Sequence, residues 1–360
     1  MHLPRHPRWP LGSQMMPNET IQVRTARDIP AEAWDRYVKS HPKGSVFHTS
    51  AMLQTLAGVP KHHPIGLAAL GTNGEIVALL AATRIETVSG LASRFASRCV
   101  WNAEPLCNAD PVGHDGLSAI IDAHDDELRG RVLFTEVRPL LAETGERTIM
   151  ESRDYVFKDY LNYVVDTTCS TDVSMARVGK STRKKIRQSF KRGVEIVIDS
   201  SHAGIERMYG LVVESYRRSQ IPLADIAMFH EAFDCLGESV VKIRLATHEG
   251  QDVAGGISLA FGDRFFAWYG GSTRPKGIVP FDCLTWDEIR WCTENQFRCY
   301  DFGGAGWPDE EYGPRDFKAK FGGELTHYGR YRKVYSPLKM RIAETGFKTL
   351  RRFVTPGATA

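Results

Sequence analysis

The stretch that most constrains the fold spans residues 300–325 and reads YDFGGAGWPDEEYGPRDFKAKFGGEL. Its apolar beginning, residues 299–302, predicts a short strand that ends at the pair Gly303-Gly304. A second pair, Gly322-Gly323, separates a short helix from a last strand. Glycine lets the backbone approach a neighbouring group closely, and loops held by a rigid scaffold concentrate binding and catalytic residues. We therefore expect this stretch to form part of the functional site.

Length and composition are those of a globular chain with two domains. The 360 residues are 42% hydrophobic and 25% charged, and no apolar run is long enough to cross a membrane. Because the net charge is only +3, binding to nucleic acid or to a membrane must depend on a local basic surface. Seven cysteines without a C-x-x-C spacing predict reduced thiols in the cytoplasm and no metal site.

Apolar periodicity gives both halves of the chain a similar order of strand, helices, antiparallel strands, helix and strand. In the first half, Asn73-Gly74 between two apolar runs predicts a hairpin, because both turn residues accept a positive φ. The other segments expected there are strands at 21–24, 98–102 and 131–137, helices from 30, at 49–57 and at 115–128, and an apolar segment at 157–165. The second half predicts strands at 195–198, 240–247, 253–261, 265–270 and 299–302, and helices at 202–218, 226–236 and 280–295. This order predicts an α+β fold with two tandem domains.

Residues 176–193, ARVGKSTRKKIRQSFKRG, lie between the two halves and contain eight basic residues and no acidic one. Ile186 and Phe190 are four residues apart, so a helix can bury that edge, and Gly193 suits the position after its end. We therefore expect a disordered tail at 1–17, a first domain at 18–170, a basic inter-domain helix at 171–193, a second domain at 194–335 and a basic amphipathic tail at 336–360.

The two tails each allow two interpretations. The sequence starts at Met1, but Met15 or Met16 can also begin the protein, since the residues before them are basic and rich in proline. In the C-terminal tail, Phe347 and Leu350 belong to a narrow apolar stripe beside basic residues. This tail can contact the inner face of an anionic membrane or pack on its own domain.

A strand that ends in YDFGG, followed by a variable loop and FK-x-K-FGG, resembles the C-terminal part of Fem-type aminoacyltransferases of the GNAT superfamily. The resemblance covers about residues 20–335 and implies two GNAT-like domains with mixed central sheets flanked by helices. Family members use an aminoacyl-tRNA donor and a peptidoglycan precursor peptide as acceptor, whereas related GNAT enzymes use acyl-CoA. The resemblance also implies a basic helix between the domains, whose tRNA-binding candidates here are Lys180, Arg183, Lys184, Arg187 and Lys191.

Residues 272–284, STRPKGIVPFDCL, connect a predicted strand to the long helix that follows. The resemblance to GNAT enzymes implies that the donor diphosphate binds here, at N–H groups of an R/Q-x-x-G-x-G/A sequence. Arg274 and Gly277 match this pattern, but Val279 replaces the last small residue and two prolines remove N–H donors. Arg274 and Lys276 can still pair with a phosphate directly. A basic turn without a ligand is the other interpretation.

The predicted transfer chemistry depends on Lys318 and Phe317. Aminolysis of an ester or thioester passes through an oxyanion that a fixed cation stabilises. The resemblance implies that Lys318 serves the transfer site and that Phe317 packs near the donor nucleobase. The opposing interpretation is a structural helix that Phe317 and Phe321 attach to the core. Asp301 is the candidate base for the attacking amine, or a cap for the next turn, and Tyr269 is a candidate donor to the intermediate, or a core residue.

These features predict an N-acyltransferase of the GNAT or Fem type. It would move an acyl or aminoacyl group from acyl-CoA or aminoacyl-tRNA to an amine of an amino-sugar, amino acid or peptide, as in precursors of the cell envelope or of secondary metabolites. Direct transfer needs no covalent nucleophile, and no Ser or Cys occupies a nucleophile-elbow pattern. The competing hypothesis is a non-catalytic binding module, which Val279, Pro275 and Pro280 favour. The expected location is the cytoplasm, including the inner face of the membrane.

Overall fold

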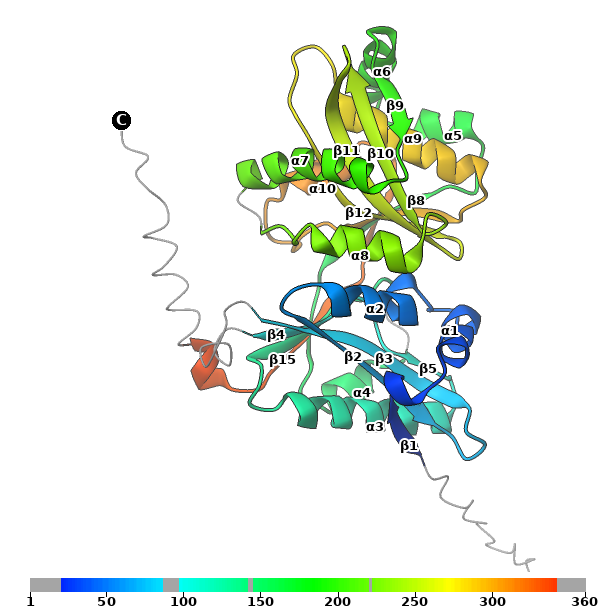
Figure 1. The fold of residues 1–360 in the computed structure, drawn as a ribbon, viewed down its shortest axis with the longest axis vertical. Coiled ribbons are helices and arrows are strands. Elements are labelled where there is room, and N and C mark those ends of the chain that lie inside the picture. The colour runs from blue at the N-terminus through cyan, green and yellow to red at the C-terminus, as the bar shows by residue number, and fades with distance from the viewer. Residues whose placement is uncertain (1–20, 87–96, 142–144, 220–221, 342–360) are drawn as a thin grey trace, which may run out of the picture.

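The computed structural model describes residues 21–86, 97–141, 145–219 and 222–341. These residues form two α+β domains stacked along the long axis of the molecule (Figure 1). Each domain contains one mixed sheet with helices on both faces, which confirms the predicted fold class. No helix in these ranges is both long enough and apolar enough to cross a membrane.

The first sheet has the strand order β1-β2-β3-β4-β6-β15-β7, and β5 pairs with β3. Its strands are β1 Gln22–Thr25, β2 His62–Leu70, β3 Ile76–Ile85, β4 Arg98–Trp101, β5 Leu106–Cys107, β6 Phe134–Val137, β7 Val156–Lys158 and β15 Arg330–Val334. The helices around it are η1 Ala26–Asp28, α1 Ala31–Ser40, η2 Val46–His48, α2 Ser50–Gly58, α3 Pro111–Leu128 and α4 Arg147–Glu151. Helix α3 begins four residues before the predicted start, because the Asp110 carboxylate accepts the Gly113 N–H at 2.7 Å and caps the helix.

Both faces of the first sheet are covered. In β3, Leu80 and Ala82 pack in one core with α3, whereas Leu79 and Ala81 pack in another with α1 and α2. Since successive strand residues point to opposite faces, two covered faces require the nearly continuous apolar run seen in this hairpin. The predicted turn is present, with β2 and β3 antiparallel and Gly74 at a φ of +78°.

The second sheet has the strand order β14-β8-β13-β12-β11-β10-β9. Its strands are β8 Leu161–Asp166, β9 Glu195–Ile198, β10 Val241–His248, β11 Gln251–Phe261, β12 Arg264–Ser272, β13 Cys299–Gly304 and β14 Glu324–His327. Its helices are α5 Thr171–Arg177, α6 Lys180–Lys191, α7 His202–Ser219, α8 Ala227–Leu236, α9 Pro280–Glu294 and α10 Gly313–Ala319. Helices α7 and α8 cover one face, and α5, α6 and α9 cover the other.

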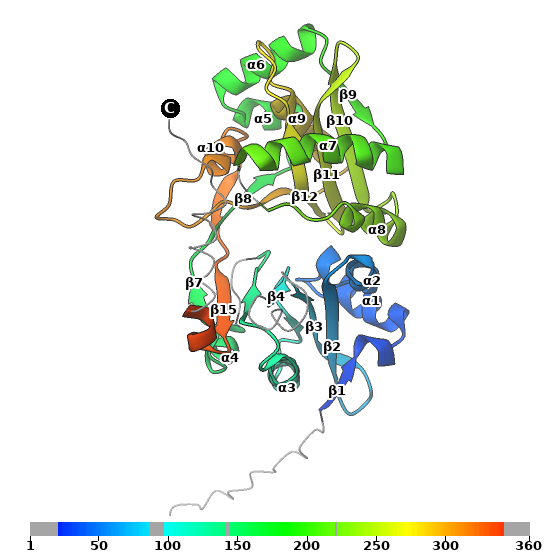
Figure 2. The same cartoon turned by 60° about the vertical axis from the view of Figure 1, so that its left-hand side comes forward.

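The chain crosses between the two sheets twice. The expected domain ranges, 18–170 and 194–335, do not include these two crossings. Strands β7 and β15 pair with each other in the first sheet, whereas β8 and β14 pair with each other in the second (Figure 2). The apolar segment predicted at 157–165 therefore contributes to both domains. Periodicity identifies strands, but only the pairing partners decide the sheet to which each one belongs.

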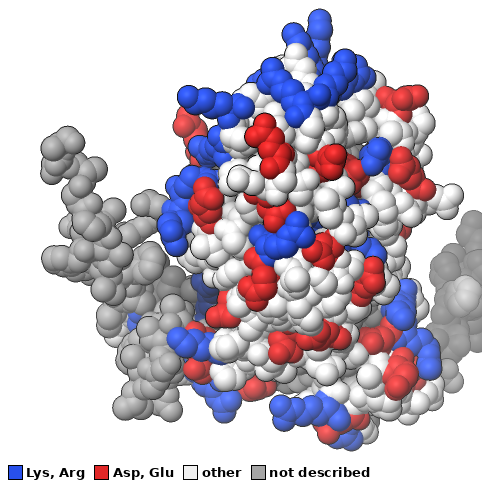
Figure 3. Space-filling view, turned by 45° about the horizontal axis from the view of Figure 1, so that its top comes forward, with Lys and Arg blue, Asp and Glu red and all other residues white. Residues whose placement is uncertain are grey.

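The basic helix α6 does not lie between the domains in space. It packs against α9 at the end of the second domain that is remote from the first, where lysines and arginines gather in Figure 3. Ile186 is buried as expected, but Phe190 is 38% exposed and Ser189 takes the buried position instead. The chain is again helical from 337 to 341, and the rest of the predicted tail, like residues 1–17, lies outside the described residues.

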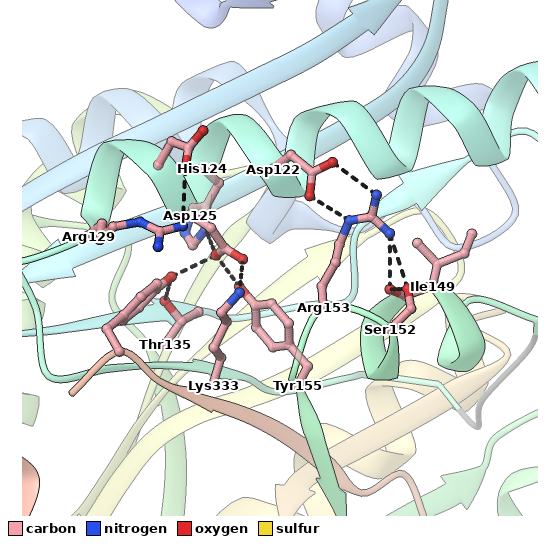
Figure 4. Close-up of polar contacts among 12 residues, drawn as sticks. Asp122, His124, Asp125, Arg129, Thr135, Ile149, Ser152, Arg153, Tyr155 and Lys333 are labelled. Carbon is pink, nitrogen blue, oxygen red and sulfur yellow. Dashed lines mark hydrogen bonds and ion pairs between the residues drawn. The ribbon is translucent and has the colours of Figure 1, made fainter. Parts of the chain in front are cut away.

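A buried polar network attaches the last strand to the first domain. The Asp125 carboxylate on α3 accepts hydrogen bonds from Tyr155 Oη at 2.8 Å, Tyr335 Oη at 2.7 Å and Lys333 Nζ at 2.7 Å. Figure 4 shows Asp125, Tyr155 and Lys333 pointing toward one another beside His124. His124 Nε2 accepts the Trp101 indole N–H at 3.0 Å, so its Nδ1 carries the proton and donates to Asp125 at 3.0 Å.

We predict that Asp125→Asn lowers the free energy of unfolding by about 3 kcal/mol at pH 7, because it leaves Lys333 without its buried partner. Burial raises the pKa of Asp125, but the hydrogen bonds from His124, Lys333 and Tyr335 outweigh it and lower the pKa to about 2. The stabilisation is therefore complete above pH about 4 and lost as the pH falls toward 2. Urea unfolding at several pH values measures this difference, which a constant value from pH 7 to pH 2 would contradict. Asp126→Asn, in an exposed pair with Arg129, is the control and should change stability by less than about 0.5 kcal/mol.

Candidate functional site

The site is built where two parallel strands diverge. Strands β12 and β13 pair with each other from their first residues up to Phe266 and Asp301. Beyond this point β12 continues to Ser272 and β13 to Gly304 without pairing to each other. Strand β12 also bulges at Trp268, where its register against β11 shifts by one residue. The gap between the two strands opens a cavity of about 570 Å³, in the size range of ligand sites.

The walls of this cavity come from six helices and strands of the second domain, which are α7, β11, β12, α9, β13 and α10. Among its lining residues are Tyr216 of α7, Tyr269 of β12, Phe281 and Glu288 of α9, and Phe317 of α10. It is therefore lined by aromatic and apolar side chains, with a few polar groups, as is usual for a small-molecule site. We call it the donor cavity.

Lys318 binds the end of β13 from inside the donor cavity. Its ammonium donates to the carbonyl oxygens of Phe302 at 2.7 Å, Gly303 at 3.3 Å and Gly304 at 2.6 Å. Burial lowers the pKa of Lys318 to about 8, against the opposing effect of the Asp301 carboxylate. The amine therefore carries a fixed positive charge near neutral pH and can release its proton only slightly above it.

A second cavity, of about 420 Å³, lies between the domains. Its lining includes Phe47 and Met52 of the first domain, and Met228 and Phe266 of the second. These four residues belong to one apolar core, in which α2 packs on α8, and this core forms the apolar part of the cavity wall. We call it the inter-domain cavity.

The two cavities share a wall. Trp268 and Tyr269 line both of them. Gly303 and Gly304 line the inter-domain cavity, while Lys318, which binds their carbonyl groups, lines the donor cavity. Ligands in the two cavities would thus meet at the bulge of β12 and the end of β13.

Arginine side chains give the inter-domain cavity a positive charge. Arg98, Arg138 and Arg330 line it, and the buried Glu136 accepts hydrogen bonds from Arg138 at 2.9 Å and Arg330 at 3.1 Å. Glu136 also pairs with Arg332, so one carboxylate balances three arginines. Burial lowers the pKa of both Arg98 and Arg330, and the neighbouring Arg138 lowers them further. This uncompensated charge favours an anionic ligand.

The structure brings together four of the seven residues predicted for the site. Lys318, Phe317, Tyr269 and Arg274 all line the donor cavity. Four of the five tRNA-binding candidates on α6 are exposed, namely Lys180, Lys184, Arg187 and Lys191. The fifth, Arg183, is half-buried and donates hydrogen bonds to carbonyl groups of α5.

Asp301 does not line either cavity among the described residues. Its fully buried carboxylate forms an ion pair with Arg264 and accepts the Gly303 N–H at 2.7 Å. Burial raises the pKa of Asp301 and Arg264 opposes this effect. The geometry is that of the alternative considered from the sequence, a strand-end aspartate that holds the following turn.

The loop before α9 is occupied by α6. Arg192 donates to the Gly277 carbonyl, and the Val279 N–H donates to Ser189 Oγ at 2.9 Å. Lys276 and Gly277 are absent from the described lining of the donor cavity. The Val279 N–H, a backbone donor that a diphosphate would approach, is thus engaged within the chain.

The glycine pairs allow close contacts of the chain with itself. A Cβ at Gly304 would lie 2.7 Å from the Tyr160 ring, and one at Gly322 would lie 2.6 Å from the Arg177 carbonyl. Gly303 and Gly322 also have positive φ values of 68° and 71°, a conformation that glycine adopts without strain. The first pair shapes the wall between the cavities, and the second joins α10 to the sheet.

Sequence reasoning missed Glu288 and the arginines of the inter-domain cavity. Glu288 is in the middle of a helix, where an acidic residue usually faces solvent, but Phe281 and Leu284, seven and four residues earlier, place it on the buried face. Arg138 and Arg330 are 192 positions apart in the sequence (330 minus 138), and only the pairing of β15 with β6 brings them together.

The comparisons with known proteins agree with this architecture. Residues 176–318 match the acetyltransferase (GNAT) domain family. The UDP-N-acetylmuramoylpentapeptide-lysine N(6)-alanyltransferase of Weissella viridescens is 21% identical over 293 residues, covering 76% of this chain and 83% of that protein. A crystal structure of FemX has a TM-score of 0.68 at 16% identity, covering 88% of this chain and 98% of its own. A tandem GNAT protein from the clavulanic acid biosynthesis pathway has a TM-score of 0.55 at 8% identity, covering 88% and 99%.

The second domain therefore matches the GNAT domain family, and the two domains of the described chain together have the tandem GNAT fold. The chain thus contains a match to the GNAT domain family at residues 176–318 and has the fold of FemX-like aminoacyltransferases.

We predict that Asp301→Asn acts on stability. Removing the charge leaves Arg264 without its buried partner and should lower the free energy of unfolding by about 3 kcal/mol. Denaturant unfolding measures this loss, and Asp263→Asn, in an exposed pair with Arg298, is the matched control with a change of less than about 0.5 kcal/mol. An Asp301→Asn protein of unchanged stability that has lost turnover would instead support the role of a base.

Proposed function

We propose that this protein is an N-aminoacyltransferase that moves an aminoacyl group from a charged tRNA to an amine of an anionic acceptor. The observation that carries the proposal is the wall shared by the two cavities, with Tyr269 on both sides and Lys318 behind it. A donor ester in one cavity and an acceptor amine in the other would meet there, which is what a direct transfer requires. The alanyltransferase similarity supports the same reaction class.

The surroundings of the loop before α9 favour tRNA over coenzyme A as donor. Ser189 Oγ already accepts the Val279 N–H of the loop, and Pro275 and Pro280 supply no N–H to a diphosphate. Helix α6 also presents a row of exposed basic side chains at helical spacing, which are Lys180, Lys184, Arg187 and Lys191. Such a row can neutralise phosphates along an RNA backbone. The alternative hypothesis is an acyl-CoA donor bound through Arg274, and the binding tests below distinguish it from a tRNA donor.

The inter-domain cavity is the proposed acceptor site. Arg98, Arg138 and Arg330 outnumber Asp225, the one acid of the described lining, and Glu136 pairs with Arg138 and Arg330 but is absent from that lining. An acceptor that carries phosphate or carboxylate groups next to its amine would fit this charge. The peptidoglycan precursor named for the Weissella enzyme is one compound of this kind, and the reaction would take place in the cytoplasm, where charged tRNA is found.

In the proposed reaction, the acceptor nitrogen attacks the ester carbon of the donor. A C–N bond forms, the ester C–O bond breaks, and the ribose oxygen leaves as a hydroxyl that takes up the proton lost by the attacking amine. The Lys318 ammonium stabilises the oxyanion by its positive charge. It also donates to the oxyanion the N–H of its longest hydrogen bond, which it releases from the Gly303 carbonyl. Tyr269 is placed on the shared wall to donate to the intermediate, while Phe317 packs against the nucleobase end of the donor.

We predict that Lys318→Met lowers kcat by about 100-fold or more, because the fixed cation near the oxyanion is lost. The wild-type rate should also decline above pH about 8, where the Lys318 ammonium, whose pKa burial lowers to about 8, loses its proton. Single-turnover rates with charged tRNA across pH 6 to 10 measure both effects. Lys320→Met, an exposed lysine on the same segment, is the control and should keep its rate within about twofold. A Lys318→Met protein that folds and turns over normally would contradict the role.

We predict that reversing the charge of Lys184, Arg187 and Lys191 together weakens tRNA binding and lowers its salt dependence, by about one unit of slope for each lost phosphate contact. Lys39→Glu, an exposed lysine on α1, is the matched control. Filter binding over a salt series measures this, and calorimetry with coenzyme A and acetyl-CoA runs in parallel.

The three hypotheses give different results. Binding of coenzyme A that Arg274→Ala abolishes, without tRNA binding, would establish an acyl-CoA donor and reject tRNA. Ligand binding that persists in Lys318→Met without turnover in the wild type would indicate a non-catalytic binding module. Tight tRNA binding with an unchanged salt slope in the triple variant would place the tRNA elsewhere on the surface.

A further inference from the structure

Glu288 is a buried carboxylate inside the donor cavity that the transfer chemistry does not use. It is 3% exposed and lies on α9 seven residues after Phe281, which is about 10 Å along the helix axis from the first turn. Leu284 and Thr285, between them, also line the cavity, so its floor follows one face of the helix inward. Glu288 is therefore at the deep end of that face.

Two neutral donors fix the direction of this carboxylate. Ser258 Oγ donates to Oε1 at 2.8 Å, and Tyr300 Oη donates to Oε2 at 2.7 Å. Because a carboxylate offers about four lone-pair sites, each oxygen can accept one more hydrogen bond. Ser258 and Tyr300 line the cavity as well, so the remaining sites are at its surface.

The charge of Glu288 has no cationic side chain in contact with it. Among the described residues, no Lys, Arg or His forms an ion pair with Glu288. The charge of the buried Arg244 acts on Glu288 from a distance, but the ion pair of Arg244 is with the neighbouring Asp287, at 3.4 Å between Nε and Oδ2. Burial raises the pKa of Glu288, and Arg244 opposes this effect. A ligand cation would supply the missing partner.

Glu288 is placed to contact the donor and not the acceptor. It lines the donor cavity but is absent from the described lining of the inter-domain cavity, whereas Tyr269 lines both. A base that deprotonates the attacking amine would have to reach that shared wall. A group deep in the donor cavity would instead contact the part of the acyl moiety that points away from the reacting carbonyl.

We propose that Glu288, held by Ser258 and Tyr300, binds an ammonium group of the aminoacyl moiety and thereby selects aminoacyl donors over simple acyl donors. This inference depends on the proposed function for its donor, but its site can be tested without turnover. The ammonium can be the α-amino group or the end of a basic side chain. Both present the same N–H donors to the carboxylate.

Binding of four small amides to the purified full-length protein tests the proposal. Alaninamide carries only an α-ammonium, 6-aminohexanamide carries only a terminal ammonium, and propionamide and hexanamide are their neutral counterparts. Titrations followed by calorimetry or ligand-observed NMR should show one ammonium amide binding about tenfold or more tightly than its counterpart. Whichever of the two does so identifies the position of the ammonium group. Equal binding within both pairs, or binding of none, would overturn the proposal.

Variants then assign the preference to Glu288. Glu288→Gln should reduce it to within about twofold, while Glu294→Gln, an exposed glutamate on the same helix, should retain it. Tyr300→Phe removes one donor but keeps the carboxylate, so it should retain a measurable preference and provides a second test if Glu288→Gln does not fold. A folded Glu288→Gln protein with the full preference would overturn the assignment, and so would a Tyr300→Phe protein without any.

Turnover of charged tRNA, measured on the same preparations, separates the two proposals. Transfer activity without an ammonium preference would reject the role of Glu288 and leave the proposed function intact. An ammonium preference that depends on Glu288, without transfer from any donor, would support the site and reject the transferase function.

Discussion

The contact on which the site depends is that of the Lys318 ammonium with three successive carbonyl oxygens at the end of β13. Three converging carbonyls repel one another unless a cation lies between them, so Lys318 stabilises a backbone that has left the pairing pattern of the sheet. The departure of β13 from β12 is also what opens the donor cavity. The charge that would stabilise an oxyanion is thus the charge that keeps the cavity open.

In the proposed reaction, the two domains divide the chemistry between them. The donor cavity lies within the second domain and is largely aromatic, whereas the inter-domain cavity is rich in arginine from the first domain. Strand β15 connects the two cavities, because the chain returns to the first sheet there, after α10 with Lys318 and the short strand β14, and brings Arg330 with it. The buried contacts of Asp125 with Lys333 and Tyr335 hold that strand in place. The relative position of the two cavities therefore depends on a polar network remote from both.

Much of the fold and the centre of the site can be predicted from the sequence, for reasons specific to each residue. Lys318 and Phe317 follow from a local pattern of glycines and aromatic residues, and Tyr269 from its position at a strand end next to two glycines. The position of Asp301 at a strand end fits both a catalytic base and a cap for the next turn, and only the fold shows that its carboxylate is paired with Arg264. Glu288 and Arg330 act through contacts between distant segments, and no local pattern encodes those. The same limit explains the domain ranges, since the segment predicted at 157–165 gives no indication that β7 and β8 belong to different sheets.

Helix α6 links the choice of donor to the packing of the second domain. Its buried Ser189 accepts the Val279 N–H of the loop before α9, a backbone donor that a diphosphate would need, and Arg192, the residue after the helix, donates to the Gly277 carbonyl. Its exposed side carries the row of cations from Lys180 to Lys191. A helix that only filled the loop would not require that row, and a helix that only bound RNA would not need to engage the loop. A change of donor from a nucleotide thioester to a charged RNA would require both the buried contact with the loop and the exposed basic row. The RNA phosphates can then be bound on the surface of the helix, which leaves the cavity to the aminoacyl end.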